Sequence, residues 1–467
     1  MSTVRKYLLV ISCLCLLQVA HADAPQAELR AVWLTTLKNI DWPKYAELSD
    51  STALIQQAEL TAILDRLQAA NINAVYFQAR PSADALYVSP YEPWSPVLTG
   101  LRGQDPGYDP LAFIIREAHA RGMQLHAWVN PFRYERVAGE RIVDIEACMA
   151  SEHSDPIRME HPDWLLTYRT QQYQGAILDP GHPEARAYVV QVVADLVRRY
   201  DIDGLVMDDY FYPYGGTNDE DRHTRKIYQP DSLSVGDWRR ACVNEVIRAL
   251  HDTIKAIKPQ ITFGMSPFGI YSMTAAAAAQ FGLTLPQGVV GTDAWADLYC
   301  DPLAWVAGGY VDYLAPQLYW STKAQRQNYE ALCRWWCESV AAIDAQRNDG
   351  KQTYVFISHA SYRFGAEELG RQIDLNRRYA PHNAPGSIFY NTNQYLNFTG
   401  GKTPENSCDK LRITHFNNAV PAPVVAQPSA PELQARPDSM TVLPDTLATD
   451  WQGSRFKRTA LRQKTDN

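Results

Sequence analysis

The stretch Asp203-Gly-Leu-Val-Met-Asp-Asp-Tyr-Phe-Tyr-Pro213 carries the clearest structural signal in this sequence of 467 residues. Its apolar centre, Leu205 to Met207, is typical of a buried β-strand. The strand delivers two adjacent carboxylates, Asp208 and Asp209, to its carboxyl end. We therefore predict a strand over Gly204-Tyr210 whose end carries acidic side chains.

Short apolar strands and longer amphipathic segments alternate on both sides of this stretch, from about Glu28 to Asn397. This alternation is typical of βα units around a parallel sheet. The other predicted strands are Leu29-Leu34, Ala74-Ala79, Gln124-Val129, Thr262-Pro267, Tyr313-Tyr319, Thr353-Ser358 and Ser387-Asn391. Helices are predicted at Gln57-Asn71, Pro110-Gly122, Pro183-Tyr200 and Asp237-Lys258. Eight such strands close a (β/α)8 barrel, the TIM-barrel fold.

An open doubly wound α/β sheet is the alternative to the barrel. Such a sheet normally carries a glycine-rich phosphate-binding turn after its first strand. Here the residues after Leu34 are Thr-Thr-Leu-Lys-Asn, which contain no glycine. The sequence favours the barrel.

Residues 1–24 have the pattern of a signal peptide. Arg5 and Lys6 form a short cationic start, Tyr7 to Ala20 is apolar, and Ala20-His21-Ala22 offers small residues for cleavage. The apolar run is shorter than the roughly 20 residues of a membrane-spanning helix. We expect a periplasmic or secreted protein without stable membrane insertion.

The sequence changes character near its end. Prolines recur at short intervals between Ala419 and Asp445 among few large apolar residues, a composition that does not support a packed core. We expect residues 25–417 to form the barrel domain and residues 418–467 to form a proline-rich, disordered tail.

Charge and cysteine content narrow the classes of partner. The formal net charge is -8, which argues against a general nucleic-acid binder.

Outside the signal segment lie Cys148, Cys242, Cys300, Cys333, Cys337 and Cys408. They permit either buried thiols or a partial set of disulfides. No histidine cluster or second cysteine pair accompanies Cys333 and Cys337, so we predict no metal and no cofactor.

Polar and aromatic residues occur near the ends of every predicted strand, where a closed core would have none. The active site of a (β/α)8 enzyme lies at the carboxyl ends of its strands, so this pattern predicts a ligand cleft there. Aromatic faces also stack on sugar rings, although most of the 12 Trp, 26 Tyr and 13 Phe are expected in the core. The predicted substrate-binding residues are Arg30, Trp33, Gln78, Arg80, His126, Trp128, Asn130, Tyr210, Ser266, Gln317, Tyr319 and Trp320.

Asp208 and Asp209 are the predicted catalytic residues. Two neighbouring carboxylates repel, so one can keep a raised pKa and hold a proton at neutral pH. Glycoside cleavage needs a protonated acid and a charged partner. The structural alternative is that one carboxylate caps a loop or pairs with an arginine. Asp208 is the safer assignment, because Asp209 would face the other way in a regular strand.

Two other chemistries are alternatives to glycoside cleavage. A hard-cation site could use the two aspartates with His126, but no His-x-His or His-x-x-x-His pair is present. No Gly-x-Ser-x-Gly segment surrounds Ser266, so serine-based nucleophilic chemistry is not indicated.

Several blocks in order resemble the glycosyl-hydrolase-like 10 family, bacterial (β/α)8 proteins of the cell envelope. These blocks are Glu28-Leu-Arg-Ala-Val-Trp33, Tyr76-Phe-Gln-Ala-Arg-Pro81, Pro93-Trp94-Ser95, His126-Ala-Trp-Val-Asn-Pro131, Asp208-Asp-Tyr-Phe-Tyr-Pro213, Phe263-Gly-Met-Ser-Pro267 and Ala315-Pro-Gln-Leu-Tyr-Trp320. The family includes a periplasmic hydrolase of peptidoglycan strands stripped of their peptides. The resemblance implies a cell-wall glycan hydrolase that acts on such denuded strands.

The central block also resembles the chitinase pattern Asp-Gly-x-Asp-x-Asp-x-Glu, but Val206 and Tyr210 stand where that pattern has an aspartate and its acidic glutamate. The chitinase mechanism therefore does not carry over. One aspartate could attack directly, activate water or steady an N-acetyl group that attacks.

Two functions remain open at this level. The first is an exported glycoside hydrolase acting on a carbohydrate polymer, either denuded peptidoglycan or another polysaccharide. The second is a non-catalytic barrel that binds cell-wall glycan, because a fold by itself does not determine activity.

Overall fold

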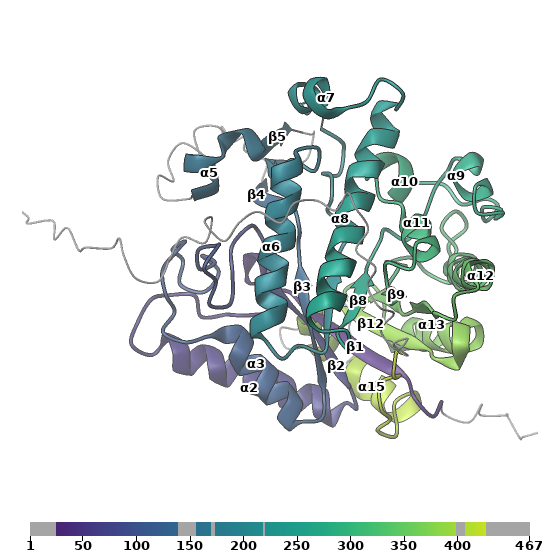
Figure 1. Ribbon diagram of the computed structural model, residues 1–467. Helices are drawn as coiled ribbons and strands as arrows, with labels where there is room; N and C mark the ends of the chain where they lie inside the picture. Colours follow the sequence, from purple (N-terminus) through teal and green to yellow (C-terminus); the bar gives the residue numbers. More distant parts are fainter. Residues whose placement is uncertain (1–24, 139–155, 170–172, 218–219, 398–406, 426–467) are drawn as a thin grey trace, which may run out of the picture.

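The computed structural model describes residues 25–138, 156–169, 173–217, 220–397 and 407–425 (Figure 1). Its main sheet is parallel, with strand order β10-β9-β8-β7-β3-β2-β1-β12-β11. The strands are β1 (Leu29–Leu34), β2 (Ala74–Arg80), β3 (Gln124–Val129), β7 (Gly204–Met207), β8 (Thr262–Met265), β9 (Tyr313–Leu314), β10 (Tyr354–Val355), β11 (Ile357–Ala360) and β12 (Gly386–Tyr390).

The sheet closes on itself because β10 and β11 are consecutive pieces of one strand. β10 pairs with β9, whereas β11 pairs with β12 on the other side. Between them, the Phe356 amide donates to the Leu314 carbonyl at 2.9 Å, and Gln317 bridges to Ser358. The predicted eight-stranded (β/α)8 barrel is therefore confirmed.

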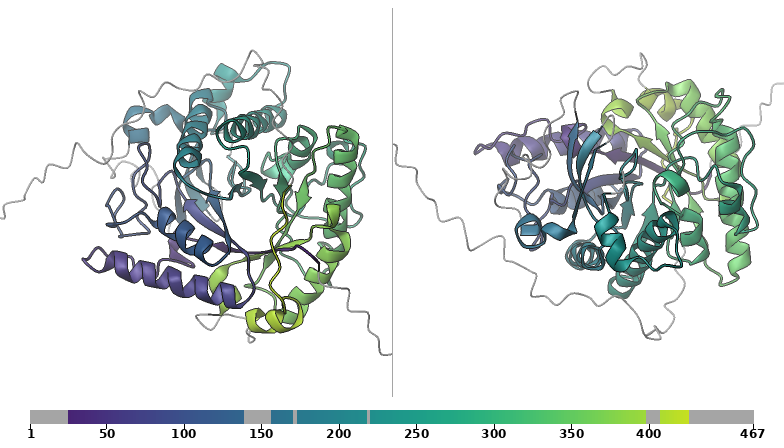
Figure 2. Two further views of the ribbon diagram at one scale, coloured as in Figure 1. Left: turned by 60° about the horizontal axis from the view of Figure 1, so that its bottom comes forward. Right: turned by 90° about the horizontal axis from the view of Figure 1, so that it is seen from above.

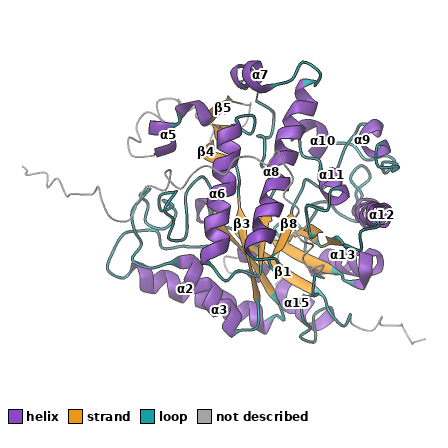
Figure 3. Ribbon diagram, in the orientation of Figure 1, coloured by secondary structure: helices purple, strands orange, loops and turns teal. Residues whose placement is uncertain are grey.

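Helices follow the strands and cover the outside of the barrel (Figures 2 and 3). They are α2 (Thr52–Ala69), α3 (Pro110–Ala120), α6 (Pro183–Arg199), α8 (Val235–Ile257), α11 (Pro302–Ala307), α12 (Tyr329–Arg347), α13 (Ala366–Tyr379) and α14 (Thr392–Leu396). Side-chain caps fix several starts: the Asp109 carboxylate accepts from the Ala112 amide at 2.9 Å, and Pro110 occupies the first turn. Across the described ranges, no helix combines the length and apolar character that a membrane crossing requires.

A small antiparallel sheet is inserted between β3 and α6. Its strands are β4 (Arg133–Ala138), β5 (Leu165–Arg169) and β6 (Tyr173–Leu178), in the order β4-β6-β5. Figure 1 shows β4 and β5 beyond the carboxyl end of β3, close to the short helix α5 (Pro156–Glu160). The sequence analysis did not predict these three strands. It brings Arg133, the first residue of β4, to the mouth of the barrel.

Several strands end earlier than predicted. β7 stops at Met207 rather than Tyr210, and β9 consists of two residues. The parallel ladder reaches its last bond where the Ser266 amide donates to the Met207 carbonyl at 2.7 Å. Beyond that point the backbone turns, and the Phe211 amide donates to the Asp209 carbonyl at 3.0 Å. The early end of β7 decides how the two aspartates are presented.

Residues 418–425 lie across the amino-terminal end of the barrel. The Glu28 amide donates to the Pro421 carbonyl at 3.0 Å, and Asn73 Nδ2 donates to the Val420 carbonyl at 2.9 Å. Ala422 and Val425 pack against the apolar cluster inside the barrel. This stretch, which we call the bottom strap, covers the face opposite the strands' carboxyl ends.

Some expectations concern residues outside the described part of the chain. These are the signal segment 1–24, the part of the predicted tail after Val425, and Cys148. The described cysteines are all buried free thiols, namely Cys242, Cys300, Cys333, Cys337 and Cys408.

Candidate active site

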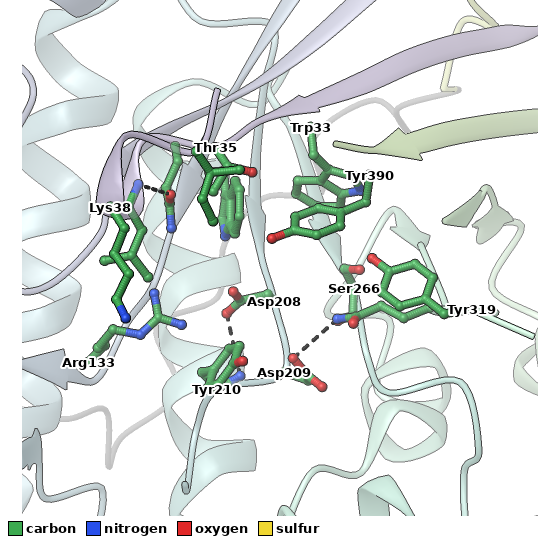
Figure 4. Close-up of a pocket in the computed structure, with 15 residues that line it drawn as sticks. Trp33, Thr35, Lys38, Arg133, Asp208, Asp209, Tyr210, Ser266, Tyr319 and Tyr390 are labelled. Atoms are coloured by element: carbon green, nitrogen blue, oxygen red, sulfur yellow. Dashed lines mark hydrogen bonds between the residues drawn. The ribbon is translucent and has the colours of Figure 1, made fainter. Parts of the chain in front are cut away.

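A cavity of about 360 Å³ opens at the carboxyl ends of the strands (Figure 4). Its walls come from the carboxyl ends of β1, β2, β3 and β12, from the segments that follow β1, β7, β8 and β9, and from the first residue of β4. They are Trp33, Thr35, Leu37, Lys38, Ile40, Gln78, Trp128, Arg133, Asp208, Asp209, Tyr210, Ser266, Gln317, Tyr319 and Tyr390.

Both aspartates of the central motif line this cavity. Asp208 is 5% exposed and Asp209 is 1% exposed. A regular strand would have turned the second carboxylate away from the first. Because β7 ends at Met207, the turn that follows directs both side chains into the same space. The adjacent pair therefore shares one cavity.

A chain of hydrogen bonds fixes the orientation of the Asp208 carboxylate. Gln78 Oε1 accepts from the amides of Thr36 at 3.0 Å and Leu37 at 2.9 Å, so its Nε2 must point the other way. That Nε2 donates to Asn130 Oδ1 at 2.7 Å, which in turn leaves Asn130 Nδ2 to donate to Asp208 Oδ2 at 2.5 Å. The two backbone amides thus define the direction of every bond up to Asp208.

A buried ion pair supports this chain from behind. Arg80 donates to both carboxylate oxygens of Glu92, through Nε at 2.8 and 3.0 Å and through Nη2 at 2.5 Å. Its Nη1 donates to the carbonyls of Asn130 at 2.5 Å and Pro131 at 3.0 Å. Arg80 therefore holds the backbone of Asn130 and does not reach the cavity wall.

Asp209 has different partners on the other side of the cavity. The Tyr214 hydroxyl donates to Oδ2, and Gln317 Nε2 donates to Oδ1 at 3.2 Å. Gln317 Nε2 also donates to the Ser266 carbonyl at 3.0 Å, which orients its amide. Both oxygens of Asp209 are thus placed by neighbouring side chains.

Burial and mutual repulsion separate the protonation of the two carboxyls. Burial raises the pKa of Asp209 to about 7, and the negative charge of Asp208 adds to the increase. Burial also raises the pKa of Asp208, but the Arg133 charge and the Asn130 hydrogen bond oppose that rise. The arrangement favours a charged Asp208 beside an Asp209 that holds a proton near neutral pH.

Aromatic rings form the remaining walls. Trp33 and Trp128 meet edge to face with ring centroids 4.9 Å apart. Tyr319 and Tyr390 lie nearly parallel, with centroids 6.0 Å apart, and both are half-buried. Trp33 is fixed by its Nε1, which donates to Ser358 Oγ at 2.8 Å. Such rigid faces suit the apolar faces of sugar rings.

Most predicted substrate-binding residues meet in this cavity. The structure brings together seven of them with the acid pair, namely Trp33, Gln78, Trp128, Tyr210, Ser266, Gln317 and Tyr319. Asn130 and Arg80 lie behind the wall, where they position Asp208 and its loop. Trp320 is not on the wall and packs edge to face against Phe268, with centroids 5.6 Å apart.

Arg30 and His126 lie near the opposite end of the barrel, which corrects the expectation that they bind substrate. Arg30 is the second residue of β1, and its guanidinium donates to Glu28 at 2.8 Å and to the Asn418 carbonyl at 2.6 Å. The His126 ring packs over Gly204, the first residue of β7, where an added Cβ would lie 2.2 Å from Nδ1. Burial lowers the pKa of His126 to about 4.

Six wall residues were missing from the prediction: Thr35, Leu37, Lys38, Ile40, Arg133 and Tyr390. Most lie in the loop after β1 or in the inserted sheet. The strand-end rule could have found Tyr390, the last residue of β12. Nothing in the local sequence pattern distinguishes Lys38 or Arg133 from the other lysines and arginines of the chain.

Within the described ranges, no three side chains of His, Cys, Asp or Glu gather in a way that could hold an ion. The acid pair instead has amide, hydroxyl and guanidinium neighbours, which suit proton chemistry.

Comparison with known proteins identifies the family of this chain. Residues 28–360 match the model described as Glycosyl hydrolase-like 10. The chain is 40% identical over 372 residues to Glycosyl hydrolase YngK of Bacillus subtilis (strain 168), covering 77% of this chain and 67% of the relative. It is 34% identical over 367 residues to Glycosyl hydrolase DigH of Escherichia coli (strain K12), covering 74% of this chain and 80% of the relative.

Among solved structures, the glycoside hydrolase domain of PgaB (BpsB) from Bordetella bronchiseptica matches with a TM-score of 0.49 at 14% identity. The match covers 82% of this chain and 98% of that domain. The barrel assignment rests on the strand pairing described above.

Proposed function

This chain belongs to the glycosyl hydrolase-like 10 family, and from that membership we propose that it is an exported glycoside hydrolase that cleaves denuded peptidoglycan strands. The observation that carries the proposal is the buried pair Asp208 and Asp209 in one aromatic-walled cavity. Glycosidases need two carboxyl groups in different protonation states, and the surroundings of this pair favour that difference.

Asp209 is the general acid in this proposal. It holds its proton near neutral pH and gives it to the glycosidic oxygen as the bond to the anomeric carbon breaks. Tyr214 and Gln317 then stabilise the carboxylate that remains, because both donate hydrogen bonds to it. The proton transfer therefore leaves a charge that already has donors in place.

Asp208 is the charged partner. Its negative charge stabilises the oxocarbenium-like centre, and Asn130 and Arg133 oppose its protonation. The anomeric configuration of the first product distinguishes its possible actions. Direct attack by Asp208, or attack by the substrate's own N-acetyl group, retains the configuration, whereas activation of water inverts it.

The substrate and location are also proposals. The resemblance to envelope proteins favours peptidoglycan strands without peptides. The cationic start and apolar run within residues 1–24 favour export to the periplasm or the medium. The aromatic walls of the cavity are consistent with a carbohydrate polymer as the binding partner.

The test compares glycans and variants. Purified protein is incubated with intact wall, denuded wall and chitin oligomers, and new reducing ends are measured. We expect cleavage of denuded wall and its loss in Asp208→Asn and Asp209→Asn, with binding to the wall retained. Binding without any cleavage by the wild type would instead favour a glycan-binding barrel. Full activity in both variants would remove the pair from the mechanism.

A further inference from the structure

The side-chain amide of Gln78 is held in a single orientation by the loop that follows β1. Gln78 lines the cavity but is only 1% exposed. Its Oε1 accepts from the backbone amides of Thr36 at 3.0 Å and Leu37 at 2.9 Å. A backbone N–H can only donate, so the oxygen and nitrogen of Gln78 cannot exchange places without the loss of both bonds.

The orientation of Gln78 is passed to Asn130, which is fully buried. Gln78 Nε2 donates to Asn130 Oδ1 at 2.7 Å. If the amide of Asn130 turned by half a rotation, its NH2 group would face the NH2 group of Gln78, and two donors would meet. The NH2 group of Asn130 is therefore kept toward Asp208, where Nδ2 lies 2.5 Å from Oδ2.

A donor at this position favours the charged form of Asp208. The other hydrogen-bond partner of its carboxyl group is the Tyr210 backbone amide, which lies 3.4 Å from Oδ1 and also can only donate. A proton on Asp208 would need an acceptor, and neither of these two described partners can accept. The surroundings of Asp208 therefore suit a carboxylate.

Asp209 differs from Asp208 in one partner. Gln317 Nε2 donates to its Oδ1 at 3.2 Å, but the second partner is the Tyr214 hydroxyl. A hydroxyl can accept as well as donate. It can therefore accept from a protonated Asp209 and donate to the carboxylate after the proton has left. This asymmetry follows from the hydrogen-bond geometry alone.

We propose that Gln78 is a positioning residue that assigns the roles of the two aspartates. It holds the NH2 group of Asn130 toward Asp208, which makes Asp208 the charged partner and leaves the proton to Asp209. This proposal rests on the proposed function. Gln78 then acts on the reaction through Asn130 and not through a contact with the sugar.

Other charges also act on Asp208, and a substitution at Gln78 leaves them in place. The ion pair of Arg80 and Glu92 lies behind Asn130. The titratable groups that share the cavity wall with Asp208 are Lys38, Arg133, Asp209, Tyr210, Tyr319 and Tyr390 (Figure 4). Because all of these remain in a Gln78 variant, a shift in the titration of Asp208 reports the loss of the amide.

The experiment titrates Asp208 directly and does not depend on cleavage. Aspartate carboxyl carbons are labelled with 13C and followed by NMR in the full chain carrying Asp209→Asn, so that Asp208 titrates without its coupled neighbour. The Asp208 signal is identified by its loss in Asp208→Asn. Gln78→Met removes both polar groups of the amide at similar length. We expect it to raise the titration midpoint of Asp208 by about 1 to 2 pH units, the range for a lost hydrogen bond to a charged group.

Two further variants keep the test independent of a general loss of structure. Gln78→Glu keeps the shape and the acceptor but loses the donor, so it should also raise the midpoint of Asp208. Gln56→Met removes another fully buried amide, whose partners Tyr45 and Leu98 lie outside the described cavity wall, and should leave the midpoint unchanged.

A double-mutant cycle tests whether the effect passes through Asn130. In an Asn130→Ala background Gln78 has no amide to orient, so Gln78→Met should shift the midpoint of Asp208 far less. An equal shift in both backgrounds would show that Gln78 acts by another route. No shift with either Gln78 variant would show that it does not position Asp208. Both results overturn the proposal.

The outcomes also separate this proposal from the function on which it rests. If the midpoints move as expected but the wild type cleaves no glycan, the proposed hydrolase function fails and the effect of Gln78 on Asp208 stands. If denuded strands are cleaved but the midpoints stay in place, the hydrolase function stands and the positioning role of Gln78 is overturned.

Discussion

Asn130 Nδ2 lies 2.5 Å from Asp208 Oδ2, and this contact is the last bond of a chain that begins at the backbone amides of Thr36 and Leu37. The side-chain amides of Gln78 and Asn130 therefore connect the loop that carries Lys38 to the Asp208 carboxylate. A change in either amide side chain should be felt at the acid pair.

Replacing Asn130 should shift the pH dependence of cleavage. Its hydrogen bond lowers the pKa of Asp208, so Asn130→Ala should raise that pKa. The charged form would then be lost at a higher pH, and the acidic limb of the kcat/KM profile should move upward. Asn376→Ala removes another buried amide, which contacts His359 and Ser387 away from the cavity, and should not move the limb. An unmoved limb in Asn130→Ala would contradict the link.

The two aspartates should respond differently to the leaving group. Loss of a general acid typically reduces the rate about 10²- to 10⁴-fold, so Asp209→Asn should lose this much on natural glycan. An aryl glycoside with an acidic phenol leaves without protonation, and it should restore much of the rate in Asp209→Asn. Asp208→Asn should stay inactive on both substrates. The reverse pattern would exchange the two roles.

The ionisation of Asp209 should lower the free energy of unfolding as the pH rises between about 4 and 7. Asp209 has its folded pKa raised to about 7, whereas the ordinary value is 3.8. In this window the folded state binds a proton that the unfolded state has lost, so the free energy of unfolding decreases with pH. Burial also raises the pKa of Asp41 to about 7, so the ionisation of Asp41 acts in the same direction.

Urea unfolding at several pH values checks this slope. Asp209→Asn and Asp41→Asn should each make the slope of the free energy of unfolding against pH more positive than in the wild type, and only the first should abolish cleavage. Asp252→Asn, at a 52% exposed side chain, should leave it unchanged. If Asp209→Asn and Asp41→Asn had the same slope as the wild type, the raised pKa values of these two carboxyls would be refuted.

Arg80 should matter for stability more than for chemistry. Removing one partner of a buried ion pair typically costs about 3–5 kcal/mol, because the other charge stays buried without compensation. Arg80→Met should therefore lower the urea midpoint strongly, and the double variant Arg80→Met with Glu92→Leu should recover part of the loss. If the double variant is no more stable than the single one, the uncompensated Glu92 is not the cause.

The bottom strap should stabilise the barrel without affecting substrate binding. A chain that ends after Asn417 loses the carbonyls that accept from Glu28, Arg30 and Asn73. A chain that ends after Val425 keeps them. We expect the shorter chain to have the lower thermal midpoint and both to share one KM. Equal midpoints would show that the strap contributes little.

The sequence predicted the barrel and the acid pair because both depend on local patterns. The apolar run before Asp208 and Asp209 defines a strand, and the strand direction then defines which end faces the active site. The prediction that Arg30 binds substrate was wrong because it did not take the strand direction into account. Arg30 is the second residue of β1 and lies near the start of the strand, so the rule that located Asp208 at a strand's carboxyl end excludes it.

Other parts of the site depend on contacts that no local pattern records. Arg133 reaches the cavity as the first residue of the inserted sheet, and the loop that carries Lys38 is held by a hydrogen bond from the Leu37 amide to Gln78 of another strand. Asp209 faces inward because the backbone turns after Met207, which a strand of regular alternation would not do. Each depends on residues far apart in the sequence.

The chain enters the barrel before Leu29 and the bottom strap crosses the same face, so both ends of the described fold, at residues 25 and 425, are remote from the cavity. A protein immobilised at residue 25 or at residue 425 would keep the mouth of its barrel turned away from the support. Such a preparation should digest a glycan layer presented from above, and it offers a simple geometry for single-molecule measurements on long strands.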